Sequence, residues 1–267
     1  MFLARLSGHP YGSCVSLGPR TRHIWHKYLF PTVDRTLPRP AHGAVWVVVP
    51  CYNEGDRLFH VLAQLVPYGH SVVVVDDGST SPVHGIERFP DIHLLRHCVN
   101  LGQGAAIQTG IDYALARGAQ YVVTFDSDGQ HLASDIDAML APLRDGQVQV
   151  ALGTRFAGGG SAHGIPATRA IVLKAAIAFT RGTTGLRITD THNGLRAFTR
   201  TAAAQLRITQ NRMAHASQVL SEIARRGLTY VEVPVTIRYT DESLAKGQRM
   251  SNAFNILWES MSGIFAR

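Results

Sequence analysis

The chain has 267 residues, of which 45% are hydrophobic and 17% are charged, with a formal net charge of +7 and a pI near 9.7. This composition excludes a disordered chain and suits one large folded domain with a sizeable core. No run of Lys and Arg is interleaved with aromatic residues, so nucleic acid is not an expected partner, and no stretch reaches the roughly 18 apolar residues that a membrane span requires.

Charge is unevenly distributed along the chain. Residues 1–42 contain six Lys/Arg and one acid, residues 43–143 contain four and eleven, and residues 144–267 contain sixteen and seven. An acidic middle followed by a basic half indicates a cation bound by the first and phosphates bound by the second, although surface charge without a function gives the same counts.

The cysteines and the N-terminus indicate a compartment. Cys14, Cys51 and Cys98 are an odd number without the spacing of metal ligands, so we expect them to be reduced. The first residues contain no uninterrupted apolar stretch of signal-peptide length. We therefore expect a cytoplasmic protein, either soluble or peripheral at the inner face of the cell membrane.

The predicted elements begin after an N-terminal arm, residues 1–42, which is basic and rich in Pro. Residues 45–49 and 71–75 are continuous runs of mostly β-branched residues, which are typical of strands buried on both faces in a parallel sheet. Apolar residues at helical spacing between these runs predict a helix over 54–66. Together these segments form a βαβ unit.

The same alternation continues to about residue 240. It predicts strands at 92–95, 121–125, 148–152 and 230–237, and helices at 104–116, 134–143, 168–180 and 214–225, with Ser134 as an N-cap. The predicted fold is therefore an α/β domain over residues 43–240, with a mostly parallel central sheet flanked by helices. Residues 241–267 are predicted to form an amphipathic helix that either contacts a membrane or partner or covers the domain's own core.

Polar loops follow several of the predicted strands, where ligands of open parallel sheets bind. Asp126 and Asp128 place two carboxylates close together, which a divalent cation holding a diphosphate would stabilise; Mg²⁺ or Mn²⁺ is the expected ion. The alternative is that both are turn or helix-capping acids. Asp76 and Asp77 are candidates to accept hydrogen bonds from a nucleobase or ribose, or form a plain Asp-Gly turn.

Two further loops also have more than one interpretation. Asn53 and Glu54 are either ligand-binding residues or an N-cap and a first-turn acid. The segment Asn100-Leu-Gly-Gln-Gly104 opens a helix with two glycines, which suits an anion or close packing. It has neither the spacing of a dinucleotide site nor the ending of a P-loop.

Six motifs in order resemble family 2 glycosyltransferases, in the branch that contains dolichyl-phosphate mannosyltransferase and bacterial polysaccharide transferases. They are Pro50-Cys-Tyr-Asn-Glu, Val75-Asp-Asp-Gly-Ser-Thr, Asn100-Leu-Gly-Gln-Gly-Ala-Ala, Phe125-Asp-Ser-Asp-Gly-Gln-His, Gly153-Thr-Arg-Phe and Asn193-Gly-Leu-Arg-Ala-Phe. The resemblance covers about residues 44–240. It implies a GT-A fold, a UDP- or GDP-linked sugar donor, inversion at the anomeric carbon, and a metal on Asp126 and Asp128.

The resemblance also implies a set of residues that bind the nucleotide sugar: Pro50, Tyr52, Glu54, Asp76, Asp77, Gly104, Asp126, Ser127 and Arg155. Two positions depart from the family pattern. Gln103 stands where many relatives carry Lys, and Gln218 stands where relatives usually carry Glu. Both departures put the choice of donor or the acceptor chemistry in doubt.

The acceptor decides which other residues are needed. A hydroxyl acceptor requires a general base, for which Asp190 is the first candidate and His192, His215 and His131 are alternatives. A lipid phosphate is already ionised and needs no base. In that case arginines would bind the phosphate, and the candidates are Arg155, Arg169, Arg196 and Arg200.

The expected function is therefore transfer of a sugar to a polyprenyl phosphate, or to a glycan or lipid-linked acceptor, in cell-envelope polysaccharide synthesis. A nucleotidyltransferase would show a Gly-rich, Arg-containing loop after the first strand, where this chain has Pro50-Cys-Tyr-Asn-Glu54. A catalytically silent nucleotide-binding subunit is the third hypothesis, raised by Gln103 and Gln218. Contact with a membrane or a membrane protein, and a homodimer, are open as partners.

Overall fold

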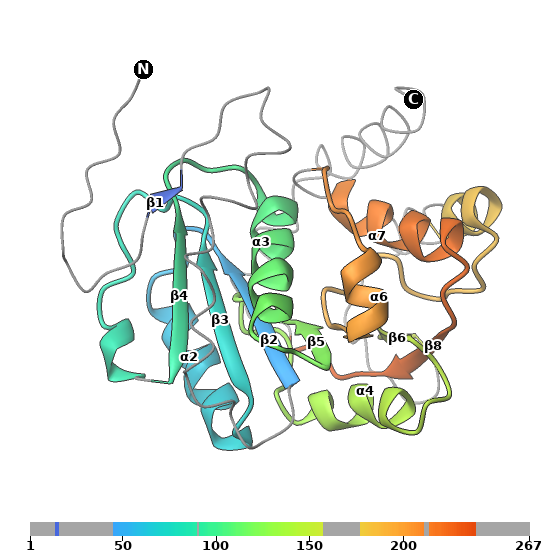
Figure 1. The fold of residues 1–267 in the computed structure, drawn as a ribbon, viewed down its shortest axis with the longest axis horizontal. Coiled ribbons are helices and arrows are strands. Elements are labelled where there is room, and N and C mark those ends of the chain that lie inside the picture. The colour runs from blue at the N-terminus through green and yellow to red at the C-terminus, as the bar shows by residue number, and fades with distance from the viewer. Residues whose placement is uncertain (1–13, 16–44, 90, 157–176, 211–213, 239–267) are drawn as a thin grey trace.

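The computed structural model describes residues 14–15, 45–89, 91–156, 177–210 and 214–238. Within them, eight strands form one sheet in the order β1-β4-β3-β2-β5-β7-β6-β8 (Figure 1). The strands are β1 (Cys14–Val15), β2 (Val45–Cys51), β3 (Ser71–Asp76), β4 (Ile92–His97), β5 (Tyr121–Thr124), β6 (Val150–Thr154), β7 (Arg196–Thr199) and β8 (Tyr230–Pro234).

Strand direction brings the polar loops together at one edge of the sheet. All paired strands are parallel except β7, which runs antiparallel to both β5 and β6. Because β7 is reversed, its first residue, Arg196, pairs with Thr124 at the end of β5. The carboxyl ends of β2, β3, β5 and β6 therefore lie at the same edge as the start of β7. The mostly parallel sheet is confirmed.

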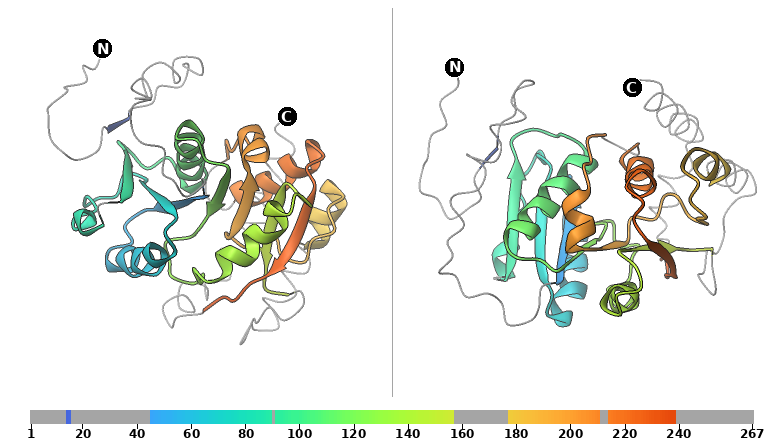
Figure 2. Two further views of the ribbon diagram at one scale, coloured as in Figure 1. Left: turned by 60° about the horizontal axis from the view of Figure 1, so that its bottom comes forward. Right: turned by 45° about the vertical axis from the view of Figure 1, so that its right-hand side comes forward.

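Helices cover both faces of this sheet (Figure 2). Side chains of α2 and α4 share a core with Val47 and Val49, whereas those of α3, α6 and α7 share a second core with Trp46 and Val48. A strand covered on both sides is apolar at every position, which explains the continuous runs in β2 and β3. The helices are α2 (Asp56–Leu65), α3 (Gln103–Ala116), α4 (Asp135–Arg144), α6 (Arg200–Gln205) and α7 (Ala214–Arg225), with two short 3₁₀ helices, η1 (Val66–Tyr68) and η2 (Ile86–Arg88).

Most predicted helices occur within a few residues of the expected bounds. The N-cap of α2 is Gly55 rather than Asn53, so the interpretation of Asn53 as an N-cap is wrong. Ser134 does occupy the N-cap position of α4, but its side chain accepts no capping hydrogen bond. The short helix α6 was not predicted. Residues 177–184 are helical, whereas the rest of the helix predicted at 168–180 lies outside the described residues.

The two ends of the chain lie mostly outside the described residues. Within the predicted arm, residues 14–15 form β1, which pairs in parallel with β4 at the edge of the sheet. The helix predicted at 241–267 lies outside the described residues. Cys98 is disulfide-bonded, which corrects the expectation of reduced cysteines, because an odd number does not exclude one pair. Cys51 is buried and free.

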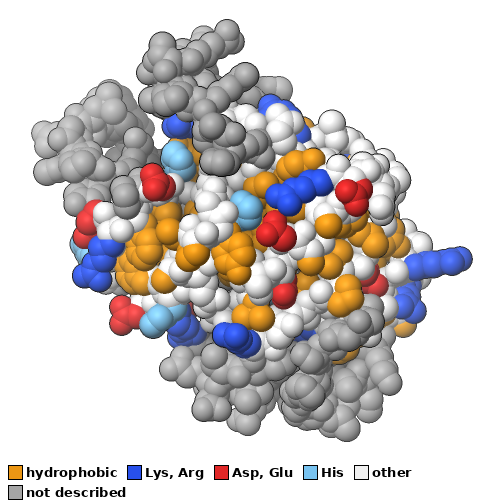
Figure 3. All heavy atoms as spheres, turned by 90° about the horizontal axis from the view of Figure 1, so that it is seen from below, with side chains coloured by type: hydrophobic (Ala, Val, Ile, Leu, Met, Phe, Trp, Pro, Cys, Tyr) orange, Lys and Arg blue, Asp and Glu red, His pale blue; other side chains and the backbone are white. Residues whose placement is uncertain are grey.

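The surface gives little direction on function. Among the described residues, no helix combines the length and apolar character needed to cross a membrane. On the face seen from below (Figure 3), hydrophobic side chains form a broken band with charged and polar side chains between and around them. Such a mixture is typical of a solvated surface.

Candidate active site

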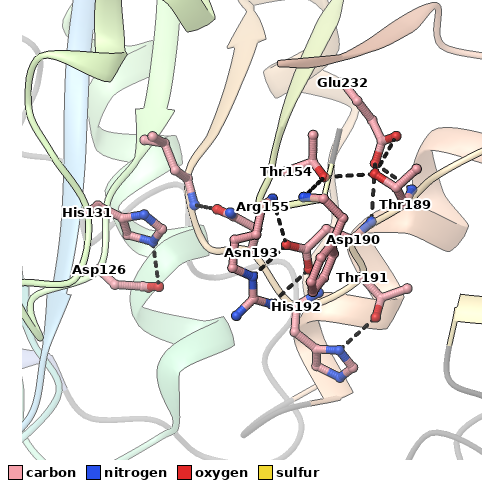
Figure 4. A network of polar contacts seen from close by, with 12 residues as sticks. Asp126, His131, Thr154, Arg155, Thr189, Asp190, Thr191, His192, Asn193 and Glu232 are labelled. Atoms are coloured by element: carbon pink, nitrogen blue, oxygen red, sulfur yellow. Dashed lines mark hydrogen bonds and ion pairs between the residues drawn. The ribbon is translucent and has the colours of Figure 1, made fainter. Parts of the chain in front are cut away.

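The carboxylate of Asp126 is held on three sides directly after β5. Gln103, the first residue of α3, donates from Nε2 to Asp126 Oδ1 at 2.9 Å. His131 Nε2 lies 3.3 Å from Asp126 Oδ2, as Figure 4 shows. The backbone of Gly194 closes the third side so tightly that a Cβ there would overlap the carboxylate. The start of α3, the loop of Asp126 itself and the segment before β7 thus together fix the orientation of Asp126.

Asp128 lies two residues further along the same loop, and its Oδ1 accepts a hydrogen bond from Gln130 N at 3.0 Å. Burial and the charge of Asp126 raise the pKa of the Asp128 carboxyl. Burial has the same tendency at Asp126, but the hydrogen bond with His131 and nearby positive charges lower the pKa of that carboxyl overall. One fully ionised carboxylate therefore makes ionisation of its neighbour less favourable, and a cation would relieve this.

The aspartate pair fits a divalent metal ion with oxygen ligands. Within the part of the chain that the structure describes, no group of three or more His, Cys, Asp or Glu side chains forms a complete metal site. An ion at Asp126 and Asp128 would need further ligands besides these two carboxylates, and the predicted Mg²⁺ or Mn²⁺ stays a prediction. Phosphate oxygens are ligands that both ions accept readily.

Asp77, directly after β3, holds the loop that leads into α3. Its Oδ1 accepts from Leu101 N at 2.9 Å and lies 2.7 Å from His97 Nδ1, and its Oδ2 accepts from Gly102 N at 2.7 Å. The carboxylate is almost completely buried. Asp77 thus connects β3, β4 and the loop before α3, and its predicted contact with a nucleoside stays a prediction.

Asp76, the last residue of β3, also bonds to groups of the protein itself. It is fully buried, its Oδ1 accepts from Ser79 N at 2.9 Å, and its Oδ2 lies 3.3 Å from Arg96 Nη1. Ser79 Oγ in turn accepts from Asn53 N at 2.9 Å. The loops after β2 and β3 are therefore joined at the carboxyl edge of the sheet.

The loop after β2 presents the remaining predicted nucleoside contacts. Pro50 is buried within the strand, while Tyr52 is 44% exposed and Glu54 lies 3.7 Å from Arg57. Asn53 is the one non-glycine residue in the described ranges with a positive φ, 54°. Backbone conformations of this kind persist where the surrounding structure enforces them, and they cluster at binding sites.

Gly104 follows Gln103 in α3, and the structure explains this glycine by packing. A Cβ at Gly104 would lie 2.8 Å from His215 Cβ and would overlap the carbonyl oxygen of Gln210. The glycine allows α3 to approach the segment before α7, which is the close-packing alternative left open by the sequence. Ser127 is buried between the two aspartates.

Arg155, which follows β6, makes a bidentate ion pair with Asp190. Its Nε lies 2.7 Å from Asp190 Oδ2 and its Nη2 lies 2.9 Å from Asp190 Oδ1 (Figure 4). The side chains are 11% and 1% exposed. Although burial opposes ionisation, the bonds from Arg155 lower the pKa of the Asp190 carboxyl. A carboxylate with a lowered pKa is a weak proton acceptor, so this geometry favours a positioning role.

The candidate histidines lie around the same region. His192 Nδ1 lies 2.7 Å from Thr191 Oγ1, and burial lowers the pKa of His192 to about 4. His131 contacts Asp126, and His215 is buried beside Gly104. His192 is therefore neutral near pH 7 and is a weak base, and its catalytic role stays a prediction.

Two of the predicted phosphate-binding arginines donate hydrogen bonds to backbone carbonyls of the protein. Arg196 is buried, donates to Asn193 O at 3.1 Å and Ala216 O at 3.2 Å, and has its pKa lowered by burial to about 10. Arg200 lies at the opposite edge of the sheet, where it donates to Ala119 O at 2.7 Å. The structure thus does not bring Arg200 to the site. Arg169 lies outside the described residues.

Comparison with known proteins identifies the family. The chain matches the glycosyl transferase family 2 model over residues 46–207. It belongs to this family. The chain is 27% identical to a UDP-N-acetylglucosamine–dolichyl-phosphate N-acetylglucosaminyltransferase of Methanococcus voltae, over 82% of this chain and 95% of that protein. It is also 27% identical to a polyprenol monophosphomannose synthase of Mycolicibacterium smegmatis, over 80% and 84%.

The glycosyltransferase also resembles a solved structure. Glucosyl-3-phosphoglycerate synthase from Mycobacterium tuberculosis, in complex with Mn²⁺, UDP and phosphoglyceric acid, aligns with a TM-score of 0.60 and 18% identity, covering 82% of this chain and 79% of that chain. The predicted GT-A fold is confirmed. Because the family consists of sugar transferases, the alternatives of a nucleotidyltransferase and of a silent binding subunit are set aside.

Sequence reasoning missed one acid that supports the site of this glycosyltransferase. Glu232, in β8, accepts at Oε1 from Thr189 N at 2.6 Å and from Asp190 N at 3.2 Å. Thr189 Oγ1 lies 2.7 Å from Thr154 Oγ1 at the end of β6. Glu232 thereby fixes the loop that carries Asp190. An acid between two valines in an otherwise apolar strand is the signal that points to it.

Gln218, the second departure from the family pattern, has a structural explanation. Its Oε1 accepts from Thr209 N at 2.9 Å and Gln210 N at 2.8 Å, while its Nε2 donates to Arg207 O at 3.0 Å. The side chain is almost fully buried. An amide serves as donor and acceptor at once, which an ionised carboxylate cannot do. Gln218 therefore holds residues 207–210 against α7.

Replacing Gln218 by Glu is expected to destabilise the glycosyltransferase by about 1–3 kcal/mol at neutral pH, because the Arg207 carbonyl loses its donor and faces a buried charge. Burial beside a carbonyl raises the pKa of the introduced carboxyl. The loss is then greatest above this raised pKa and shrinks as pH falls toward the unfolded value of about 4.3. Urea denaturation at several pH values measures this, with Gln120→Glu at an exposed position as control. Equal stability of Gln218→Glu and wild type at pH 8 would contradict the assignment.

Proposed function

We propose that this glycosyltransferase is an inverting, metal-dependent enzyme that transfers a sugar from a nucleoside-diphosphate sugar to a polyprenyl phosphate in cell-envelope polysaccharide synthesis. The observation that carries the proposal is the Asp126–Asp128 pair at the carboxyl end of β5, where Gln103 and His131 hold Asp126 in place and the loops after β2 and β3 lie alongside. The solved relative with Mn²⁺ and UDP supports a divalent ion and a uridine nucleotide.

Different residues of the site would bind the nucleoside and the diphosphate of the donor. Tyr52 and the linked loops after β2 and β3 would bind the nucleoside, and Asp126 and Asp128 would hold the metal against the diphosphate. When bound, the cation stabilises the negative charge that develops on the departing phosphate. Gln103, His131 and Gly194 keep Asp126 in one orientation, so the site is organised before the donor arrives.

The ionised groups favour a lipid phosphate over a hydroxyl as acceptor. A phosphate is already ionised at neutral pH, whereas a hydroxyl requires a general base. Asp190 is engaged by Arg155, and His192 has a pKa of about 4, so neither is well suited as a base. The names of two relatives specify dolichyl phosphate and a polyprenol product. Arg155 and Arg169 are the proposed phosphate-binding residues, and the enzyme would act at the cytoplasmic face of the membrane.

The metal part is tested by Asp128→Ala. Wild type is expected to bind UDP or GDP at least about tenfold more tightly with Mn²⁺ or Mg²⁺ than with a chelator, a difference of about 1.4 kcal/mol. Asp128→Ala should lose most of this gain, as measured by titration calorimetry. Asp137→Ala is the control, since that carboxylate is 61% exposed on α4. Equal binding by wild type with and without chelator would refute the proposed metal.

The acceptor is tested with wild-type enzyme, membrane extract and a labelled sugar nucleotide. Label in a lipid that mild acid hydrolyses is expected, because a glycosyl phosphate is acid-labile. Asp128→Ala supplies the blank for this assay. Label that enters only an acid-stable glycan would show that a hydroxyl is the acceptor and that the lipid-phosphate proposal is wrong.

A further inference from the structure

The side chains of Gln103 and His131 contact the carboxylate of Asp126, and one of them, Gln103, carries no charge. Gln103 crosses from the first turn of α3 to donate an amide hydrogen to Oδ1, and His131 faces Oδ2. The His131 ring is 4% exposed, and its Nδ1 has no hydrogen-bond partner within the described structure. Of these two contacts, the one from Gln103 is uncharged by residue type, because an amide side chain does not ionise.

Arg196 lowers the pKa of Asp126 through its charge, but the hydrogen bonds that it makes go to the backbone. Arg196 directs its hydrogen bonds to the backbone carbonyls of Thr191, Asn193 and Ala216. Asp128 receives its hydrogen bond from the backbone of Gln130. The groups at hydrogen-bond distance from the two carboxylates thus include the Gln103 amide, the His131 ring and the Gln130 peptide N–H. Gln103 therefore orients Asp126 without adding a positive charge beside it.

A substitution at residue 103 would directly change the charge next to the Asp126 carboxylate. The first residue of α3 already places its terminal nitrogen at 2.9 Å from Asp126 Oδ1. A lysine at the same position would bring a permanent positive charge to the same carboxylate. Leucine, in contrast, would remove the hydrogen bond and add no charge.

We propose that Gln103 determines how strongly nucleotide binding depends on the divalent cation. As a neutral donor, it orients Asp126 and leaves the metal as the main counter-charge for the two carboxylates and the incoming diphosphate. With lysine at 103, part of that counter-charge would belong to the protein. This inference rests on the proposed function, because it presumes that a nucleoside diphosphate and a metal bind at this pair.

The test compares the metal-dependent gain, which is the Kd for UDP in chelator divided by the Kd in Mn²⁺, by titration calorimetry on the full chain. Gln103→Lys is expected to bind UDP more tightly in chelator and to show a gain reduced by about tenfold, which corresponds to about 1.4 kcal/mol. Gln103→Leu, which adds no charge, should keep a gain at least as large as that of wild type. Gln120→Lys adds the same charge at an exposed position before β5 and should leave the gain unchanged.

Failures of the inference and of the proposed function are distinguishable. If wild type shows a gain and Gln103→Lys shows the same gain, Gln103 does not set the metal dependence and the inference is overturned, while the proposed function stands. If wild type shows no gain, both are overturned. A reduced gain in Gln120→Lys equal to that in Gln103→Lys would also overturn the inference, since net charge alone would then explain the effect. Thermal unfolding of each variant establishes that the fold is retained.

Discussion

Gly194→Ala is expected to reduce transferase activity by about 100-fold or more while the protein remains folded. A Cβ at this position would overlap the carboxylate of Asp126, and Thr124 Oγ1 donates to Gly194 O at 2.7 Å, so the backbone cannot simply move away. The aspartate must then turn from the orientation set by Gln103 and His131. A misplacement of about 1 Å at a catalytic site can cost about two orders of magnitude in rate.

Activity with the labelled donor, together with Mn²⁺-dependent binding of UDP, measures this effect. Gly182→Ala is the matched control, because a Cβ there would have no heavy atom within 4 Å. The control should behave as wild type in both assays. Gly194→Ala with wild-type metal-dependent binding would mean that the carboxylate adapts, and that its fixed orientation is not needed.

The sequence predicted the fold best where buried strands produce continuous apolar runs. Strands β2 and β3 are covered on both faces, so their unbroken apolar runs could be predicted, and the polar residues after them marked the functional edge. The reversed strand β7 was not predicted as such, because its four residues carry no periodicity that distinguishes direction. Yet this reversal is what brings Gly194 and Arg196 beside the end of β5.

Side-chain pairing could not be predicted from residue type alone. Arg155 and Asp190 were assigned separate roles, as a phosphate ligand and a general base, but they are partners across 35 positions of sequence. The same applies to Gln103, which was recognised as a departure from the family although its contact with Asp126 requires the sheet to place α3 beside the loop after β5. The chemistry of a charged residue depends on its neighbour, and the neighbour is set by tertiary structure.

Asp190→Asn is expected to lower the free energy of unfolding by about 3–5 kcal/mol, the cost of leaving one partner of a buried ion pair uncompensated. Asp190 accepts from both the side chain and the backbone of Arg155 and from His192 N at 3.2 Å, so the change loosens the loops after β6 and before β7. The altered position of Arg155 should also weaken use of a polyprenyl-phosphate acceptor more than binding of UDP.

The pH dependence separates this positioning role from proton transfer. Because Arg155 lowers the pKa of Asp190 in the folded state, the carboxylate contributes stability above its unfolded pKa of about 3.9, and the contribution disappears as pH falls through the lower folded value. The difference between wild type and Asp190→Asn should therefore be constant from pH 7 to about 5 and shrink below about pH 4. Denaturant titrations at each pH measure it, with the exposed pair of Asp137 and Arg144 as control, where Asp137→Asn should cost less than about 1 kcal/mol. An Asp190→Asn protein as stable as wild type but inactive would instead identify Asp190 as the general base, and a hydroxyl would then become the favoured acceptor.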